Sequence, residues 1–165
     1  MDELRRLPIF LAFCLAQVLI FSRVHLLGCS TPYVMLFFLL LFPIGYPQWR
    51  LMLWSFAMGL IIDMFNNTPG VSSASLTLIA AIQAPLLKLL SPRDSDDNTL
   101  PSTKDLGWGN FTVYATIITA IFCFVYTLLE LFSFFDFLYF IACVVGSTLF
   151  TLLFHMTLER FRVKK

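Results

Sequence analysis

Five ionisable side chains lie in or beside long apolar segments, and they are the residues of this sequence that could do chemistry. They are Arg23, His25, Asp63, Glu130 and Asp136. A carboxylate inside a membrane is costly, and where one occurs it marks a proton, ion or ligand site by default. Two membrane aspartates would suit an intramembrane peptidase, but Asp136 falls in a break between apolar segments. The surrounding residues match no such peptidase motif, so we do not expect catalysis.

The sequence also lacks the short motifs that catalytic and cofactor sites use. It contains no G-x-S-x-G, no H-E-x-x-H and no Gly-rich phosphate loop. Its four cysteines form no C-x-x-C pair, which argues against a thioredoxin-like or zinc site. A net charge of +1 favours neither nucleic acid nor acidic substrates as partners. We therefore expect a non-enzymatic protein without a cofactor or bound metal.

The composition predicts a protein that lies within a membrane. Of its 165 residues, 59% are apolar and 13% are charged, whereas soluble domains carry about 25% charged residues. A chain this short cannot bury so much apolar surface in one soluble core. The expected fold is an all-α integral membrane protein with one transmembrane domain over residues 1–165 and no internal repeat.

Six apolar segments can position the ionisable residues. They cover residues 7–22, 33–46, 48–65, 71–90, 111–132 and 137–158. A membrane helix needs about 20 apolar residues, so the second segment, which ends between Pro43 and Pro47, must be irregular or partly re-entrant. The first segment is longer than a signal-peptide core and lacks a small-residue cleavage site, so we interpret it as a retained span. The polar stretch 91–110 is predicted to be a flexible cytoplasmic loop.

The basic residues predict the orientation of these six spans. Of the 11 Lys and Arg residues, only Arg23 falls outside the loops and ends that share a side with both termini. Basic residues collect on the cytoplasmic side of membrane proteins. The sequence therefore predicts a multi-pass membrane protein with both termini in the cytoplasm.

In this orientation the five ionisable residues gather at the outer face. The simpler interpretation is that they lie at the interface, reach water and pair with one another. In the alternative, Asp63 orders an outer loop or contacts a partner, with Arg23 as its counter-charge. Arg23, His25 and Glu130 would then form a polar cluster at that face.

Two other polar residues within the spans have predicted structural roles. Gln83 precedes Pro85 by two positions, and its amide is expected to satisfy the carbonyl that the proline leaves unpaired. His155, near the inner end of the last segment, is expected to be an interfacial residue rather than a ligand. Small residues four apart predict close helix packing; the pairs are Ala12/Ala16, Ser55/Gly59, Ala80/Ala84 and Ala142/Gly146.

Residues 55–75 carry a motif that resembles a known family. The stretch reads Ser-Phe-Ala-Met-Gly-Leu-Ile-Ile-Asp-Met-Phe and continues Asn-Asn-Thr-Pro-Gly-Val. It is similar to the signature F-x-x-G-L-(I/L)-x-D-(M/L)-F and the following turn of the rod shape-determining protein MreD family. The chain length, Gln17 in the first span, the Pro-ended second span and the basic C-terminus also agree with that family.

The resemblance implies a non-enzymatic subunit of the bacterial cell-elongation (rod) complex, surrounded by membrane lipid. It implies binding to MreC, a single-span periplasmic scaffold, and action beside MreB, RodA and the elongation transpeptidase in cell-shape maintenance and lateral peptidoglycan synthesis. It further implies roles for four residues. Gly59 would permit close helix packing, Asp63 would cap or pair at the outer face, and Pro69 with Gly70 would fix the turn.

The alternative is the substrate-binding S-component of an energy-coupling-factor vitamin transporter, whose six-helix bundle the MreD family resembles in fold. That family often carries an A-x-x-x-A pair in its first span, which meets the energising subunit, and Ala12 and Ala16 fit this pattern. Asp63, Glu130 and Arg23 would then line an outward vitamin pocket. The Gly-to-Asp motif favours the MreD resemblance.

Overall fold

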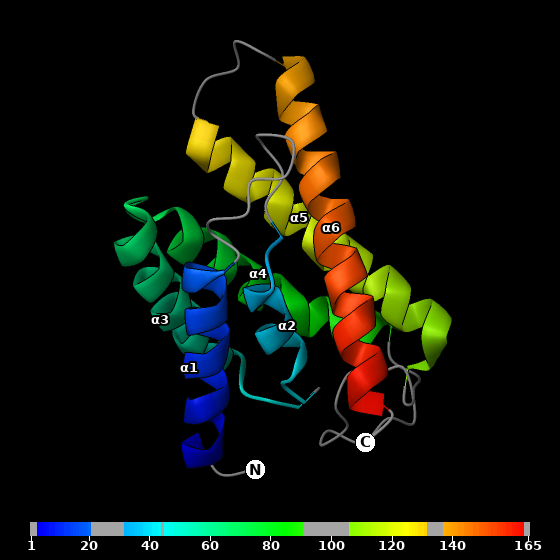
Figure 1. Cartoon of the computed structure of the whole chain (residues 1–165). Coiled ribbons are helices and arrows are strands. Elements are labelled where there is room, and N and C mark those ends of the chain that lie inside the picture. The colour runs from blue at the N-terminus through cyan, green and yellow to red at the C-terminus, as the bar shows by residue number, and fades with distance from the viewer. Residues whose placement is uncertain (1–2, 21–31, 44, 91–105, 132–136, 164–165) are drawn as a thin grey trace.

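The computed structural model describes residues 3–20, 32–43, 45–90, 106–131 and 137–163, which form six helices and no strand (Figure 1). The helices are α1 (Glu3–Leu19), α2 (Met35–Leu40), α3 (Gln48–Asn66), α4 (Val71–Leu90), α5 (Gly107–Leu131) and α6 (Phe137–Val163). The predicted all-α architecture is confirmed for this part of the chain.

Helices α4, α5 and α6 are each long and apolar enough to cross a membrane. Helix α1 has a shorter apolar stretch, Arg6–Leu19. Helix α3 has 19 residues and includes Arg50 and Asp63. These lengths and compositions indicate a membrane-associated protein.

Helix α6 shows how the bundle distributes polar and apolar side chains. Many of its large apolar side chains point outward, with Leu138 86% and Leu153 64% exposed. Its buried side includes Thr151, His155 and Glu159. A soluble protein has the opposite arrangement, whereas an apolar exterior suits lipid, so the packing supports the membrane assignment.

Two helices extend beyond the predicted apolar segments, and the second segment is mostly not helical. Helix α5 begins at Gly107, so the polar loop predicted over 91–110 is shorter than expected, and residues 91–105 lie outside the described part. Helix α6 continues to Val163 instead of ending at 158. In the second segment only Met35–Leu40 is helical, because Pro43 and Pro47 prevent the helix from continuing, and this agrees with the irregular segment that the sequence predicts.

The first turn of α1 and the last turn of α6 lie at the same end of the bundle, the lower end in Figure 1. The turn between α3 and α4 lies towards the opposite end. This arrangement is the one that an even number of passes requires. The assignment of the shared end to the cytoplasm stays a prediction.

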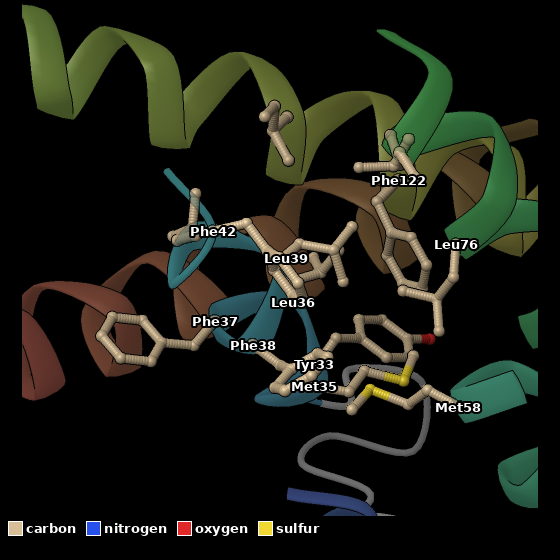
Figure 2. Close-up of a cluster of buried hydrophobic side chains, with 14 of the residues drawn as sticks. Tyr33, Met35, Leu36, Phe37, Phe38, Leu39, Phe42, Met58, Leu76 and Phe122 are labelled. Carbon is tan, nitrogen blue, oxygen red and sulfur yellow. The ribbon is translucent and has the colours of Figure 1, made fainter. Parts of the chain in front are cut away.

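Helix α2 fills the space between the longer helices. All six of its side chains are buried. Figure 2 shows Leu36, Phe38 and Leu39 within a cluster that includes Met58 of α3 and Phe122 of α5. The short second segment is therefore a core element and not a regular span.

The chain entering α2 receives its hydrogen bonds from side chains of α1 and α6. Gln17 of α1 donates through Nε2 to the carbonyl of Pro32 and accepts through Oε1 from the N–H of Met35, both at 3.3 Å. Thr151 Oγ1 of α6 accepts the N–H of Tyr33 at 3.1 Å. In an apolar interior, backbone groups outside a regular helix need such partners.

Two glutamines donate hydrogen bonds to backbone carbonyl groups. One carbonyl lies near the C-terminal end of α2, and the other is the carbonyl in α4 that a proline leaves unpaired. Pro85 has no N–H, which leaves the carbonyl of Ala81 unpaired. The prediction that Gln83 satisfies this carbonyl is wrong. Gln48 donates to it through Nε2 at 2.8 Å, while Gln83 donates across the bundle to the carbonyl of Leu39 at 2.8 Å.

We predict that Gln17→Leu lowers the free energy of unfolding by about 1–2 kcal/mol, because two buried backbone groups lose their partner. The measurement is the midpoint of SDS-induced unfolding in mixed micelles. Thr116→Val is the control, since this hydroxyl bonds the Thr112 carbonyl of its own helix. Equal midpoints for the two variants would show that Gln17 does not hold α2 in place.

Candidate functional site

Helices α3 and α4 pack with no room for a side chain at Gly59. A Cβ atom built there would lie 2.3 Å from Cα and 2.5 Å from the backbone N of Ser73. These neighbours are backbone atoms, so they could move only if the helices separated. Ser55, one turn earlier, is also buried, and its hydroxyl donates to the Leu51 carbonyl of its own helix. Small residues at both positions allow the close approach.

The carboxylate of Asp63, one turn after Gly59, holds the beginning of α4. Oδ1 accepts the N–H of Ser72 at 2.8 Å, and Oδ2 accepts the N–H of Ser73 at 3.0 Å. Amides in the first turn of a helix have no partner within that helix. The residue before α4 is Gly70, which has no side chain to cap them, so α3 supplies the cap. A negative charge at this end of a helix also interacts favourably with the positive end of the helix dipole.

The turn between the two helices uses residues with suitable backbone preferences. Asn67 follows α3 in the left-handed region with φ 56°, a conformation that Asn tolerates. The carbonyl of Thr68 accepts the N–H of Val71 at 3.4 Å, with Pro69 and Gly70 between them. Gly70 has φ 88°. A proline at the second position of a turn and a glycine with positive φ at the third are typical of a type II turn.

The four motif residues therefore belong to one unit, which we call the α3–α4 joint: Gly59, Asp63, Pro69 and Gly70. Gly59 sets the spacing of the helices, Asp63 caps α4, and the Pro-Gly pair forms the turn. Asp63 is 6% exposed and both its oxygens are engaged within the chain. This geometry favours the loop-ordering interpretation of Asp63 over direct contact with a partner. A role of the joint in partner binding stays a prediction.

Tyr126 of α5 packs beside the joint, and the sequence analysis missed it. Its hydroxyl lies within electrostatic range of the carboxylates of Asp63 and Glu130. Tyr126 is buried, whereas Glu130, one turn later, is exposed. The four-residue spacing from Glu130 was the sequence signal that could have identified it.

The predicted outer polar cluster is represented in the described residues by Glu130. Arg23, His25 and Asp136 lie outside the part of the chain that the structure describes. Their pairing with Asp63 or Glu130 stays a prediction.

The expectation that His155 is an interfacial residue is wrong. His155 is fully buried, and so is Glu159 one turn later, which the sequence analysis did not single out. Both belong to a line of buried residues at four-residue spacing along α6, comprising Cys143, Ser147, Thr151, His155 and Glu159. That spacing was visible in the sequence, but it could not show that this face points into the bundle.

The described side chains were compared with the requirements of a metal site. Within the ranges that the structure covers, no group of three His, Cys, Asp or Glu residues is placed to hold a metal ion. Cys14, Cys123 and Cys143 are buried free thiols. The α3–α4 joint acts as a structural connection that joins two helices through a tight turn.

We predict that Gly59→Ala destabilises the fold by about 1–3 kcal/mol, because the new methyl group overlaps the α4 backbone. The midpoint of SDS-induced unfolding measures the effect. Gly109→Ala is the matched control, since a Cβ there meets nothing within 4 Å. This control should leave the midpoint unchanged or raise it slightly, because Ala favours helix. A tolerated Gly59→Ala would mean that α3 and α4 are not in close contact.

We predict that Asp63→Ala lowers the free energy of unfolding by about 1–2 kcal/mol, because the first amides of α4 lose their acceptor. Asp63→Asn should retain part of the stability, since one oxygen can still accept. Hydrogen exchange at the amides of Ser72 and Ser73 should accelerate in the Ala variant. Glu130→Ala serves as the exposed-carboxylate control, and an equal effect from this control would contradict the capping role.

Comparison with known proteins finds no family model, no curated protein and no solved structure that matches this chain. A proposal about its function therefore rests on its own residues and geometry.

Proposed function

We propose that this chain is a non-enzymatic, MreD-type membrane subunit of the bacterial cell-elongation complex. In this role it binds MreC and supports cell-shape maintenance and lateral peptidoglycan synthesis, with MreB, RodA and the elongation transpeptidase as indirect partners. It lies in the cytoplasmic membrane with both termini in the cytoplasm.

The observation that carries this proposal is the construction of the α3–α4 joint. Three of the four motif residues on which the resemblance rests meet a geometric requirement there. Gly59 faces backbone at a distance that excludes any side chain, Asp63 caps a helix that starts after a glycine, and Gly70 has a positive φ. A motif of this kind suits a protein whose role is to present a rigid surface.

The packing of α2 also supports a scaffold over a transporter. A vitamin-binding subunit needs an outward pocket lined by convergent polar groups. Here the large apolar side chains of α2 occupy the space between the longer helices. Asp63, which the transporter alternative places in the pocket, is engaged in capping α4.

The outer end of α3 offers a surface on which a single-span partner could dock. Met64 and Phe65 are strongly exposed there, directly before the exposed turn residues Asn67 and Pro69. A transmembrane helix with a periplasmic extension, as in MreC, could contact the apolar side chains with its helix and the turn with the extension. We propose this end of α3 as the MreC contact.

One observation favours the S-component alternative. Ala12 is exposed and Ala16 half-buried, so the small-residue pair of α1 lies on the lipid-facing side, where an energising subunit could reach it. Ala80 of another such pair is buried within the bundle instead.

Site-specific photocrosslinking tests the proposal. A benzoylphenylalanine at Phe65 should crosslink in cells to a bitopic protein that mass spectrometry identifies as MreC. The same group at Leu138, exposed at the outer-end start of α6, is the control and should give at least fivefold less of that product. Crosslinks at neither position, or equal yield at both, would contradict the proposed contact.

Purification of the tagged protein in mild detergent separates the two functions. Recovery of MreC with wall-synthesis enzymes would support the proposal, and Asp63→Ala should reduce that recovery more than Glu130→Ala. Recovery of paired ATPases with a multi-span coupling subunit, lost in Ala12→Leu, would overturn it in favour of the transporter.

A further inference from the structure

Helix α6 buries one line of polar side chains against the rest of the bundle. Its members, which we call the α6 seam, are Ser147, Thr151, His155 and Glu159, and the last three are 0% exposed. The seam extends toward the end of the bundle that holds the first turn of α1 and the last turn of α6. It is independent of the α3–α4 joint.

His155 is the residue of the seam whose polar atoms are unmatched. Neither Nδ1 nor Nε2 has a hydrogen-bond partner among the residues that the structure describes. Its ring packs against Phe37 of α2, with the ring centroids 5.8 Å apart, and Phe37 has no polar side-chain atom to offer. A neutral imidazole carries one donor and one acceptor, and leaving both unmatched in an apolar interior is unfavourable.

The neighbouring seam residues already take part in other interactions. Thr151 accepts the N–H of Tyr33, and Glu159 has an interaction of its own. Side chains four residues apart on a helix stand about 5–6 Å apart at Cβ. Thr151 and Glu159, one turn to either side on the same buried line, are therefore the seam residues nearest to the His155 ring along α6. Buried waters typically occupy positions of this kind, where they bridge otherwise unsatisfied polar atoms.

We propose that the α6 seam binds internal water at His155. One water bonds a ring nitrogen of His155 and bridges toward Thr151, and a second bonds the other nitrogen and bridges toward Glu159. The seam is thus a hydrated polar site enclosed by an apolar exterior. The chemical class of its ligand is water rather than a metal ion or an organic substrate.

Solid-state NMR of the protein in lipid bilayers tests this proposal. The chain contains two histidines, so His25→Gln leaves His155 as the only source of histidine nitrogen signals. After labelling with ¹⁵N-histidine, magnetisation should pass from water to the His155 ring nitrogens at short mixing times. Both nitrogens should show the chemical shifts of hydrogen-bonded imidazole.

The matched control places the only histidine on the lipid side of α6 at nearly the same depth. It combines His25→Gln, His155→Leu and Leu153→His, since Leu153 is exposed and two residues away. Water transfer to this ring should be at least threefold slower than to His155. The primary measurement uses the native His155, so it does not depend on how well the control folds.

Two results would overturn the proposal. Transfer to His155 no faster than to the lipid-facing control would show that no water reaches the ring. Hydrogen-bonded shifts without water transfer would show that a protein group, from outside the described residues, binds the imidazole instead.

Discussion

The fold depends on one constraint: every backbone polar group in an apolar interior needs a hydrogen-bond partner. Helix α2 has six residues and lies wholly inside the bundle, so its ends cannot reach water. Gln17 and Thr151 bond the chain that enters α2, and Gln83 bonds a carbonyl near its end. Helices α1, α4 and α6 are thereby tied to one buried segment by polar side chains.

The α3–α4 joint solves the same problem at the start of α4. The first amides of α4 would be unpaired after Gly70, and Asp63 supplies both acceptors from the preceding helix. This cap reaches its target only because Gly59, one turn earlier, lets the two helix backbones approach closely. The glycine and the aspartate are therefore coupled: the packing at one makes the hydrogen bonds at the other possible.

These two features together describe a bundle with a filled interior and an apolar exterior. The apolar side chains of α2 take up the central space, and exposed leucines on α6 face outward. A protein built in this way presents surfaces to lipid and to other membrane helices. The scaffold role proposed above uses such surfaces.

Several parts of the fold could be predicted from the sequence because they depend on local chemistry. Apolar runs placed the helices, prolines at 43 and 47 limited the second segment, and Pro69-Gly70 predicted the turn. The motif spacing put Gly59 and Asp63 on one face of a helix. These features follow from backbone preferences and from the period of the helix, which are properties of short stretches of chain.

Only the tertiary structure decided which polar groups meet. Gln83 bonds α2, Gln48 bonds the carbonyl freed by Pro85, and His155 is buried rather than interfacial. A helix that is apolar on most faces carries no clear periodic signal for its rotation in the bundle. The partner of a polar side chain depends on that rotation and on where helices cross, and neither is encoded in the spacing along one segment.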